Sequence, residues 1–302
     1  MLEQITCPAD LRRLSHDDLG LLSHEIRNFI VETVQENGGH LGSNLGVVEL
    51  TIALHRVFDS PRDIMLWDTG HQAYVHKMLT GRLENFKSLR KAGGLSGYPS
   101  RAESEHDWIE NSHASTALSY AFGIATAQAS DEGEGRRVLA VIGDGALTGG
   151  MAFEGLNNLG HAGSNAIIIL NDNGRSYAPT VSLLSDSLKK LRNNPKYLEQ
   201  QEKLENKVKS LLPSKEVMGL SVERAIDAAK AAVREIWDPT SFFEDLGLRY
   251  NGPFDGHNIE ALEKAFRNAA GFEGPTVIHV LTEKGRGYGP AENDPIKRLH
   301  DI

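Results

Sequence analysis

Two short polar sequences contain the residue types that bind a divalent cation. Gly-Asp-Gly occupies positions 143–145 and Asn-Asp-Asn occupies positions 171–173. Asp144 and Asn173 are 29 positions apart, which leaves room for a helical crossover between parallel strands and would bring both strand ends to one edge of a sheet. Carboxylate and amide oxygens are ligands that Mg²⁺ prefers, with backbone carbonyls and phosphate oxygens completing an octahedron. We therefore predict a magnesium site that holds a phosphorylated ligand.

A dinucleotide-binding turn is the main alternative for the first sequence. Gly143, Gly145 and Gly149 loosely match the glycine spacing of such turns. Charge argues against it, because a carboxylate about 4 Å from a pyrophosphate oxygen would be repelled by roughly 4 kcal/mol at an effective dielectric constant of about 20. Asp144 suits a diphosphate site only with a cation between the two. A purely structural turn is the remaining alternative.

Four of the 12 histidines lie in loops that contain glycine or serine, namely His40, His71, His113 and His300. An imidazole can donate, accept or transfer a proton near neutral pH, so these four are candidates for acid-base chemistry. Ser43 follows His40 by three positions and is a further pocket candidate. We expect ordinary surface or core roles for the histidines at positions 16, 24, 55, 76 and 161.

Strands that alternate with helices would position these residues. Apolar runs predict strands, and amphipathic or alanine-rich stretches predict helices. The predicted strands are 63–67, 138–142, 166–170 and 275–281, and the predicted helices are one from Ser15 to Gly38-Gly39, then 47–58, 114–129, 151–159 and 259–270. Residues 40–46 are predicted to form a glycine-rich loop. The pattern predicts an α/β fold with an open, mostly parallel sheet and helices on both faces, whose ligands bind at the carboxyl ends of the strands.

The segment 182–217 differs from the rest because charged and polar residues dominate it. We interpret it as an insertion that is either a mobile lid or a solvated helical hairpin without a function of its own. Residues 1–302 are expected to form one domain that includes this insertion.

Composition excludes several classes of protein. Of the 302 residues, 40% are hydrophobic and 24% are charged, which is typical of a globular protein. The formal net charge of -9 argues against a general nucleic-acid-binding protein. No apolar run approaches the roughly 20 residues of a membrane span, and the N-terminus has no signal sequence, so we expect a cytoplasmic protein. The single cysteine, Cys7, fits a reducing compartment.

The Gly-Asp-Gly and Asn-Asp-Asn pair resembles the thiamine diphosphate motif of transketolase-like enzymes. The flanking sequences are similar to those of the 1-deoxy-D-xylulose-5-phosphate synthase family in particular. They are WDTGHQAYVHKMLTGR from Trp67, GGLSGYPSRAESEHD from Gly93, VIGDGALTGGMAFEGLNN from Val141, NDNGRSYAP from Asn171, GPFDGHNIEAL from Gly252 and KGRGYGPAENDP from Lys284. The resemblance covers nearly the whole chain and implies the diphosphate-binding domain of the thiamine diphosphate fold.

The resemblance also implies roles for particular residues. Mg²⁺ would be bound by the side chains of Asp144 and Asn173 and by the carbonyl oxygen of Arg175. The cofactor diphosphate would be contacted by Gly143, Gly145, Ala146 and Lys284. The alternative for Lys284 is an exposed lysine in a turn.

The loop histidines acquire roles in the same way. His40, His71 and His300 would be catalytic, and the cofactor contacts would also include His71, Ser43, Ser112, His113 and Ala114. Residues 111–116 read Asn-Ser-His-Ala-Ser-Thr, whereas many relatives have Gly-His-Ser-Ser-Thr, so this loop departs from the family pattern around the histidine. The match at His300 is weaker because the spacing before it varies among relatives.

The activity implied by the resemblance is a condensation of pyruvate with D-glyceraldehyde 3-phosphate that yields 1-deoxy-D-xylulose 5-phosphate and CO₂. Relatives are about twice as long and carry a pyrimidine-binding domain, whose glutamate contacts the cofactor, and a C-terminal domain. We expect this chain to supply the magnesium and diphosphate half, to need such a domain or a second chain as partner, and to be inactive alone. A homo-oligomer is expected. The alternatives are the N-terminal subunit of a split transketolase and a non-catalytic cofactor-binding partner.

Overall fold

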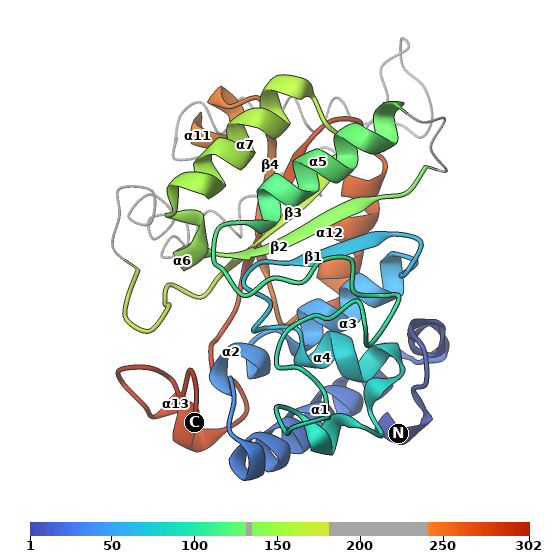
Figure 1. Cartoon of the computed structure of the whole chain (residues 1–302), viewed down its shortest axis with the longest axis vertical. Helices are drawn as coiled ribbons and strands as arrows, with labels where there is room; N and C mark the ends of the chain where they lie inside the picture. The colour runs from blue at the N-terminus through green and yellow to red at the C-terminus, as the bar shows by residue number, and fades with distance from the viewer. Residues whose placement is uncertain (131–134, 181–240) are drawn as a thin grey trace, which may run out of the picture.

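The computed structural model describes residues 1–130, 135–180 and 241–302 (Figure 1). The segment 182–217, which we interpreted as a lid or a helical hairpin, lies outside the described residues. Within the described part, no helix is long and apolar enough to span a membrane.

In the described part of the chain, five parallel strands form one open sheet in the order β1-β2-β3-β5-β4. The strands are β1 (Ile64–Trp67), β2 (Val138–Gly143), β3 (Ala166–Asp172), β4 (Arg249–Asp255) and β5 (Thr276–Leu281). Four of them were predicted from their apolar runs, and the α/β class with a parallel sheet is confirmed.

Strand β4 was not predicted. It lies at the edge of the sheet and contains Gly252 and Pro253, residue types that argue against a strand. The register shifts between Asn251 and Phe254, so the glycine and the proline occupy an irregular part of the ladder with β5. An edge strand tolerates such a break, because β5 is the only strand that pairs with it within the described residues.

Helices cover both faces of the sheet, and alternate strand residues point to one face or the other. In β1, Met65 and Trp67 belong to the core that the sheet forms with α1 (His16–Asn37), α3 (Val48–Val57) and α12 (Ile259–Ala270). Ile64 and Leu66 belong to the opposite core, with α5 (Ala117–Ser130), α7 (Gly150–Ala162) and α11 (Ser241–Asp245). Figure 1 shows α5 and α7 on one side of the sheet and α1 and α3 on the other.

The first long helix illustrates how the sequence sets its ends. Ser15 accepts a hydrogen bond from the backbone N-H of Asp18, and the Asp18 side chain accepts one in return, which forms a capping box. The apolar residues that follow pack into the core. Gly38 ends the helix at φ 74°, a conformation that glycine adopts readily.

Short helical turns connect the main elements. The segment 40–46, predicted to be a loop, contains the helical turn α2 (Gly42–Leu45), because the backbone of these buried residues closes its own hydrogen bonds. The short elements are η1 (Leu2–Gln4), η2 (Pro8–Arg13), α2 (Gly42–Leu45), α4 (Tyr74–Lys77), η3 (Met78–Arg82), η4 (Phe86–Ser88), α6 (Asp144–Leu147) and α13 (Gly289–Glu292).

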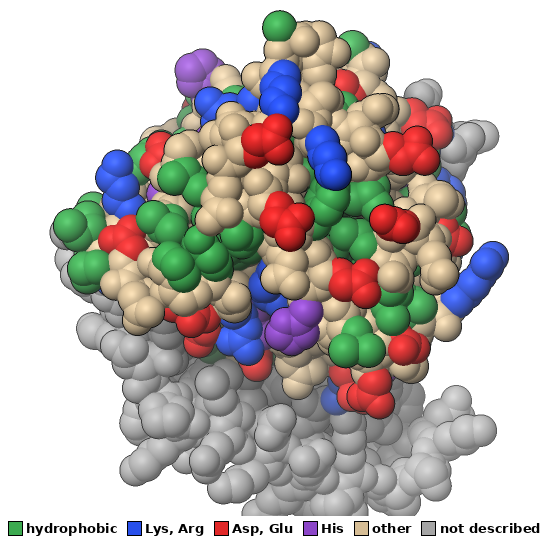
Figure 2. All heavy atoms as spheres, turned by 90° about the horizontal axis from the view of Figure 1, so that it is seen from below, with side chains coloured by type: hydrophobic (Ala, Val, Ile, Leu, Met, Phe, Trp, Pro, Cys, Tyr) green, Lys and Arg blue, Asp and Glu red, His purple; other side chains and the backbone are tan. Residues whose placement is uncertain are grey.

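Elements that are distant in sequence meet at the carboxyl edge of the sheet. In Figure 1, α6, α2, α13 and the C-terminus lie along one side of the molecule. The face seen in Figure 2 carries Lys and Arg side chains interspersed with Asp and Glu rather than a continuous basic surface. On that face the charge pattern does not suit a nucleic-acid backbone.

Candidate active site

The structure holds the Asp144 carboxylate against the loop that begins at Asn173. Strands β2 and β3 pair in register up to Gly143 and Asn171, so the two polar sequences lie at the same edge of the sheet. Asp144 is 4% exposed, and its Oδ2 accepts a hydrogen bond from Thr180 Oγ1 at 2.7 Å. The backbone N-H of Thr180 donates to the carbonyl of Gly174 at 3.2 Å. Thr180 therefore links the predicted carboxylate ligand to the turn that carries the predicted amide ligand.

The turn after β3 is shaped by its own polar side chains. Oδ1 of Asn173 accepts the backbone N-H of Arg175 at 3.1 Å. The Arg175 guanidinium donates to the carbonyls of Pro295 and Ile296 at 2.9 and 3.0 Å. The side chain of Arg175 thus anchors the C-terminal segment, while its backbone belongs to the loop next to Asp144.

The donor set at this edge fits magnesium. Among residues 1–130, 135–180 and 241–302, no three His, Cys, Asp or Glu side chains gather as a metal-binding group. One carboxylate, one amide and backbone carbonyls nevertheless supply the hard oxygens that Mg²⁺ accepts, and Mg²⁺ commonly takes its remaining ligands from phosphates and water. The edge therefore suits a cation that arrives together with a phosphorylated ligand.

A buried lysine lies at the same edge. Lys284 is 5% exposed, so it is not an exposed lysine in a turn. Its Nζ donates to the carbonyl of Ser176 at 2.6 Å and lies 2.6 Å from Nδ1 of His300. Burial and the nearby Arg175 charge lower the pKa of Lys284 to about 8, and the Asp144 carboxylate acts in the opposite direction. The lysine and the predicted metal ligand are thus close enough for their charges to interact.

Three of the four loop histidines form one cluster. The ring centroids are 5.1 Å apart for His40 and His71, 5.5 Å for His40 and His300, and 5.4 Å for His71 and His300. Nδ1 of His40 and Nδ1 of His71 are buried, and neither has a hydrogen-bond partner within the described part of the chain. Buried polar atoms are normally hydrogen-bonded, so this pair fits a site completed by a polar ligand.

Backbone pairing places His300 in this cluster. The N-H of Leu41 donates to the carbonyl of His300 at 3.1 Å, and His40 forms an antiparallel bridge with Asp301. Gly42 permits the approach, because a Cβ there would lie 2.0 Å from the carbonyl oxygen of Arg298. A side chain at position 42 would therefore separate the two segments.

Some residues of the cluster were not predicted from the sequence. Asn44 Nδ2 donates to the carbonyls of both His40 and His71, each at 2.8 Å, and so holds the two histidine loops together. The ring of Tyr177 lies 4.1 Å from that of His300, and the ring of Tyr98 lies 6.1 Å from that of His40. The only sequence signal for Asn44 was its place in a glycine-rich segment.

The predicted pocket residue Ser43 is buried, 2% exposed, and its Oγ lies 3.3 Å from Nδ1 of His300. His113 lies outside the ring contacts that join the other three histidines. It is exposed, as are Ser112 and Ala114. Contact of these three residues with a cofactor stays a prediction.

The loop that carries His113 is nevertheless tied to the metal-binding edge. Ser115 Oγ donates to the carbonyl of Ala146 in α6 at 2.6 Å. Asp68, next to the His71 loop, accepts the N-H groups of Ser115 and Ala117 at 2.9 and 3.0 Å. A Cβ at Gly149 would lie 2.1 Å from Ser115 Oγ. The glycine is therefore explained by loop packing, without a dinucleotide at that position.

The clustered histidines are expected to stay neutral near neutral pH. Burial, with the neighbouring His40, His300 and Lys284, lowers the pKa of His71 to about 3. Burial, with Lys284 and His40, lowers the pKa of His300 to about 4. An NMR titration of the ring protons should therefore show no protonation of either residue above about pH 5, far below the ordinary imidazole value. A midpoint near the ordinary value would contradict this arrangement.

A second buried hydrogen-bond network contacts the backbone next to Lys284. Arg27 forms a two-pronged pair with Glu49, at 2.7 and 2.6 Å, and donates to the carbonyl of Leu45. His257 Nδ1 lies 3.0 Å from Glu49 Oε2, and its Nε2 accepts the backbone N-H of Glu283. The network thus links α1, α3 and α2 to the residue that precedes Lys284.

Glu49→Gln is expected to destabilise the chain by about 3 kcal/mol, because it leaves buried charges without their partner. Burial alone would raise the pKa of Glu49, but hydrogen bonds from His257 and Arg27 lower it from 4.5 to about 2. The stabilisation is therefore present above pH 4.5 and is lost as the pH falls toward 2. Urea unfolding across this range should show a weaker pH dependence for the variant. If the free energy of unfolding depends on pH to the same extent in both proteins, the role assigned to Glu49 is wrong.

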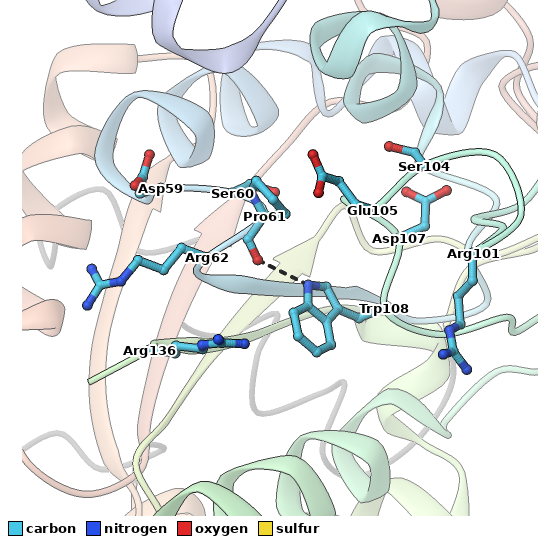
Figure 3. A pocket seen from close by; sticks show the side chains of 10 residues that line it. All are labelled: Asp59, Ser60, Pro61, Arg62, Arg101, Ser104, Glu105, Asp107, Trp108 and Arg136. Carbon is cyan, nitrogen blue, oxygen red and sulfur yellow. Dashed lines mark hydrogen bonds between the residues drawn. The ribbon is translucent and has the colours of Figure 1, made fainter. Parts of the chain in front are cut away.

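A cavity of about 640 Å³ lies elsewhere and includes none of the predicted site residues. Figure 3 shows Arg62 and Arg136 on one side of it and Asp107 and Arg101 on the other, with the Trp108 side chain between these two groups. Asp107 is already bound by Arg82 and His76, and Trp108 Nε1 donates to the carbonyl of Pro61. Asp107 and Trp108 are therefore already paired within the chain.

Sequence comparison identifies related proteins. A family model described as 1-deoxy-D-xylulose-5-phosphate synthase matches residues 2–282. A protein with that description from Mycobacterium leprae (strain Br4923) is 55% identical over 300 residues, which cover 99% of this chain and 46% of the relative. One from Frankia casuarinae is 53% identical over 302 residues, which cover 100% of this chain and 45% of the relative. The chain spans somewhat less than half the length of these curated relatives.

Structural comparison finds transketolases. The transketolase from Campylobacter jejuni gives a TM-score of 0.64 at 19% identity, covering 96% of this chain and 41% of the transketolase. The transketolase from Leishmania mexicana gives a TM-score of 0.61 at 18% identity, covering 89% and 37%. At such low identity the likeness supports the fold alone.

Proposed function

Because the chain belongs to the 1-deoxy-D-xylulose-5-phosphate synthase family, we propose that it supplies the magnesium- and diphosphate-binding half of a thiamine-diphosphate-dependent transferase. The complete enzyme condenses pyruvate with D-glyceraldehyde 3-phosphate, which gives 1-deoxy-D-xylulose 5-phosphate and CO₂. The other half is a pyrimidine-binding domain or a second chain, and the working form is a homo-oligomer. The observation that carries the proposal is the contact from Asp144 through Thr180 to the turn at Asn173, with buried Lys284 at the same edge.

In this proposal the metal and the diphosphate share that edge. Asp144 and Asn173 bind Mg²⁺ through side-chain oxygens, and Arg175 binds it through its carbonyl oxygen. Backbone groups of residues 143, 145 and 146 contact the diphosphate. Lys284 offsets its negative charge as a compact point charge. Ser112, His113 and Ala114 contact the cofactor from the loop that Ser115 ties to α6.

The bound cofactor would supply a carbon nucleophile, which amino-acid side chains do not provide. The chain's own residues orient the substrate and handle protons. Lys284 donates to Nδ1 of His300, which leaves Nε2 as the donor of that ring. His40 and His71 each keep a buried Nδ1 for a substrate or cofactor group. Because burial lowers the pKa values of all three rings, they donate and accept hydrogen bonds in the neutral form.

Reconstitution tests the proposed activity. The chain would be mixed with a polypeptide that covers the remaining half of the Mycobacterium leprae relative, in the presence of thiamine diphosphate and Mg²⁺. Release of CO₂ from pyruvate, dependent on glyceraldehyde 3-phosphate, is expected only from the mixture. Turnover by this chain alone would refute the proposal that activity needs the other half. Ketose phosphate conversion without CO₂ release would indicate a split transketolase, and absence of cofactor binding would indicate a non-catalytic partner.

A further inference from the structure

His279 is a fully buried polar residue in the middle of an apolar strand. It has no exposed surface in β5, whose sequence is TVIHVL. A buried imidazole costs free energy unless both of its nitrogens find partners. Its Nε2 lies 3.0 Å from Oδ2 of Asp172, and its Nδ1 lies 2.6 Å from the hydroxyl of Tyr250. The histidine therefore joins the two strands that flank β5.

The register of the sheet explains why these three side chains meet. His279 pairs with Leu170 in β3, and Asp172 lies two residues further along the same strand, so it points to the same face. Tyr250 in β4 pairs with Val277, two residues before His279, and also shares that face. The Tyr250 ring stacks on Phe243 at 5.6 Å, which fixes the hydroxyl.

Asp172 is the residue immediately before the predicted metal ligand Asn173. It is 2% exposed, and its Oδ1 accepts the N-H of Gly174 at 3.0 Å, which closes the turn around position 173. Its Oδ2 is held by His279. A carboxylate attracts a cation more strongly than an amide does, so the partners of Asp172 decide which oxygen the turn offers to a metal ion.

We infer that His279, supported by Tyr250, is a positioning residue that keeps the Asp172 carboxylate inside the sheet, so that the turn presents the Asn173 amide at the metal-binding edge. This inference rests on the proposed function for the role of the edge. It assigns to the tyrosine a donor role toward Nδ1 and leaves Nε2-H to donate to Asp172. Magnesium selectivity then depends on the hydrogen bonds that join Tyr250 in β4, His279 in β5 and Asp172 in β3.

Replacing His279 should loosen the turn before any ligand is added. In His279→Leu, exchange of the Gly174 amide hydrogen should be at least about tenfold faster, because the carboxylate that accepts it loses its anchor. His279→Gln is the matched control, since its amide can still donate to Asp172. Its Gly174 amide should exchange at nearly the rate of the unchanged chain. The amide of Ala140 in β2 should exchange at its original rate in all variants, which would show that the fold is intact.

Metal preference gives a second readout. With inorganic pyrophosphate as the probe, His279→Leu should weaken Mg²⁺-dependent binding about tenfold or more, as expected for an outer-shell partner. The released carboxylate should shift the preference toward Ca²⁺, which takes more oxygen ligands. Adding Asp172→Asn should restore the original preference. If His279→Leu does not fold, Tyr250→Phe carries the same test with smaller effects.

Unchanged exchange at Gly174 in a folded His279→Leu or Tyr250→Phe variant would overturn the inference. So would a loss of Mg²⁺ binding that is equal for Leu and Gln at position 279. If the unchanged chain binds no pyrophosphate with Mg²⁺, the proposed function fails instead, and the exchange of the Gly174 amide still decides whether His279 positions the turn.

Discussion

Replacing Asp144 by alanine is expected to abolish magnesium-dependent binding of thiamine diphosphate while leaving the chain folded. The substitution removes a predicted metal ligand rather than a core side chain. The affinity should fall by more than the roughly 10- to 100-fold that is lost when a residue hydrogen-bonded to a metal ligand is removed. Because the carboxylate also accepts the Thr180 hydroxyl, a stability loss of about 1 kcal/mol is expected in addition. Isothermal titration calorimetry with and without Mg²⁺ measures the affinity.

Two control variants separate the roles of Asp144. Asp144→Asn keeps an oxygen that can accept the Thr180 hydroxyl but removes the negative charge, so it should lose most of the metal dependence and little stability. Thr180→Val removes the hydroxyl and keeps the carboxylate, so it should retain metal-dependent binding with a modest loss. If Asp144→Ala unfolds in the absence of ligand, Asp144 is structural and its assignment as a ligand is wrong.

Lys284→Met should weaken diphosphate binding by roughly 10- to 100-fold, the value expected for a hydrogen bond to a charged group. It should also change the pH dependence. The pKa of Lys284 is lowered to about 8, mainly by burial. The ammonium is therefore present below that pH and is lost above it, so affinity in the unchanged chain should fall as the pH rises through 8.

The matched variant for this test is Lys284→Arg. A guanidinium stays charged throughout the range, so binding by the arginine variant should vary little with pH, even if its different shape lowers the affinity. The methionine variant should also vary little, at a weaker level. A decline near pH 8 that persists in the methionine variant would show that another group titrates and would contradict the role given to Lys284.

Much of the fold could be predicted from local sequence patterns. The runs at 138–142 and 166–170 are short, apolar and followed by polar turns, as expected of central parallel strands, and they became β2 and β3. The candidate site lies at the carboxyl ends of these two strands, where the sequence predicted it. Strand β4 could not be predicted, because Gly252 and Pro253 interrupt the alternation of apolar and polar residues that marks a strand. Only its pairing with β5 identifies it.

The site was predicted in part for the same reason. Local sequences indicated Asp144, Asn173 and the loop histidines, because each lies in a distinctive short motif. Asn44, Thr180 and His279 could not be recognised, since their roles come from contacts between segments far apart in the chain. The burial of Lys284 was equally invisible to the sequence, because it depends on the segment that pairs with His40.

The most direct test of the central claim is a comparison of ligands in one calorimetric titration series. Thiamine diphosphate would be titrated into this chain with Mg²⁺ and with EDTA, and thiamine without phosphate would be titrated with Mg²⁺. The account predicts binding only when both the cation and the diphosphate are present, because the edge at Asp144, Asn173 and Lys284 recognises that pair. Equal binding in EDTA, or equal binding of thiamine, would contradict it.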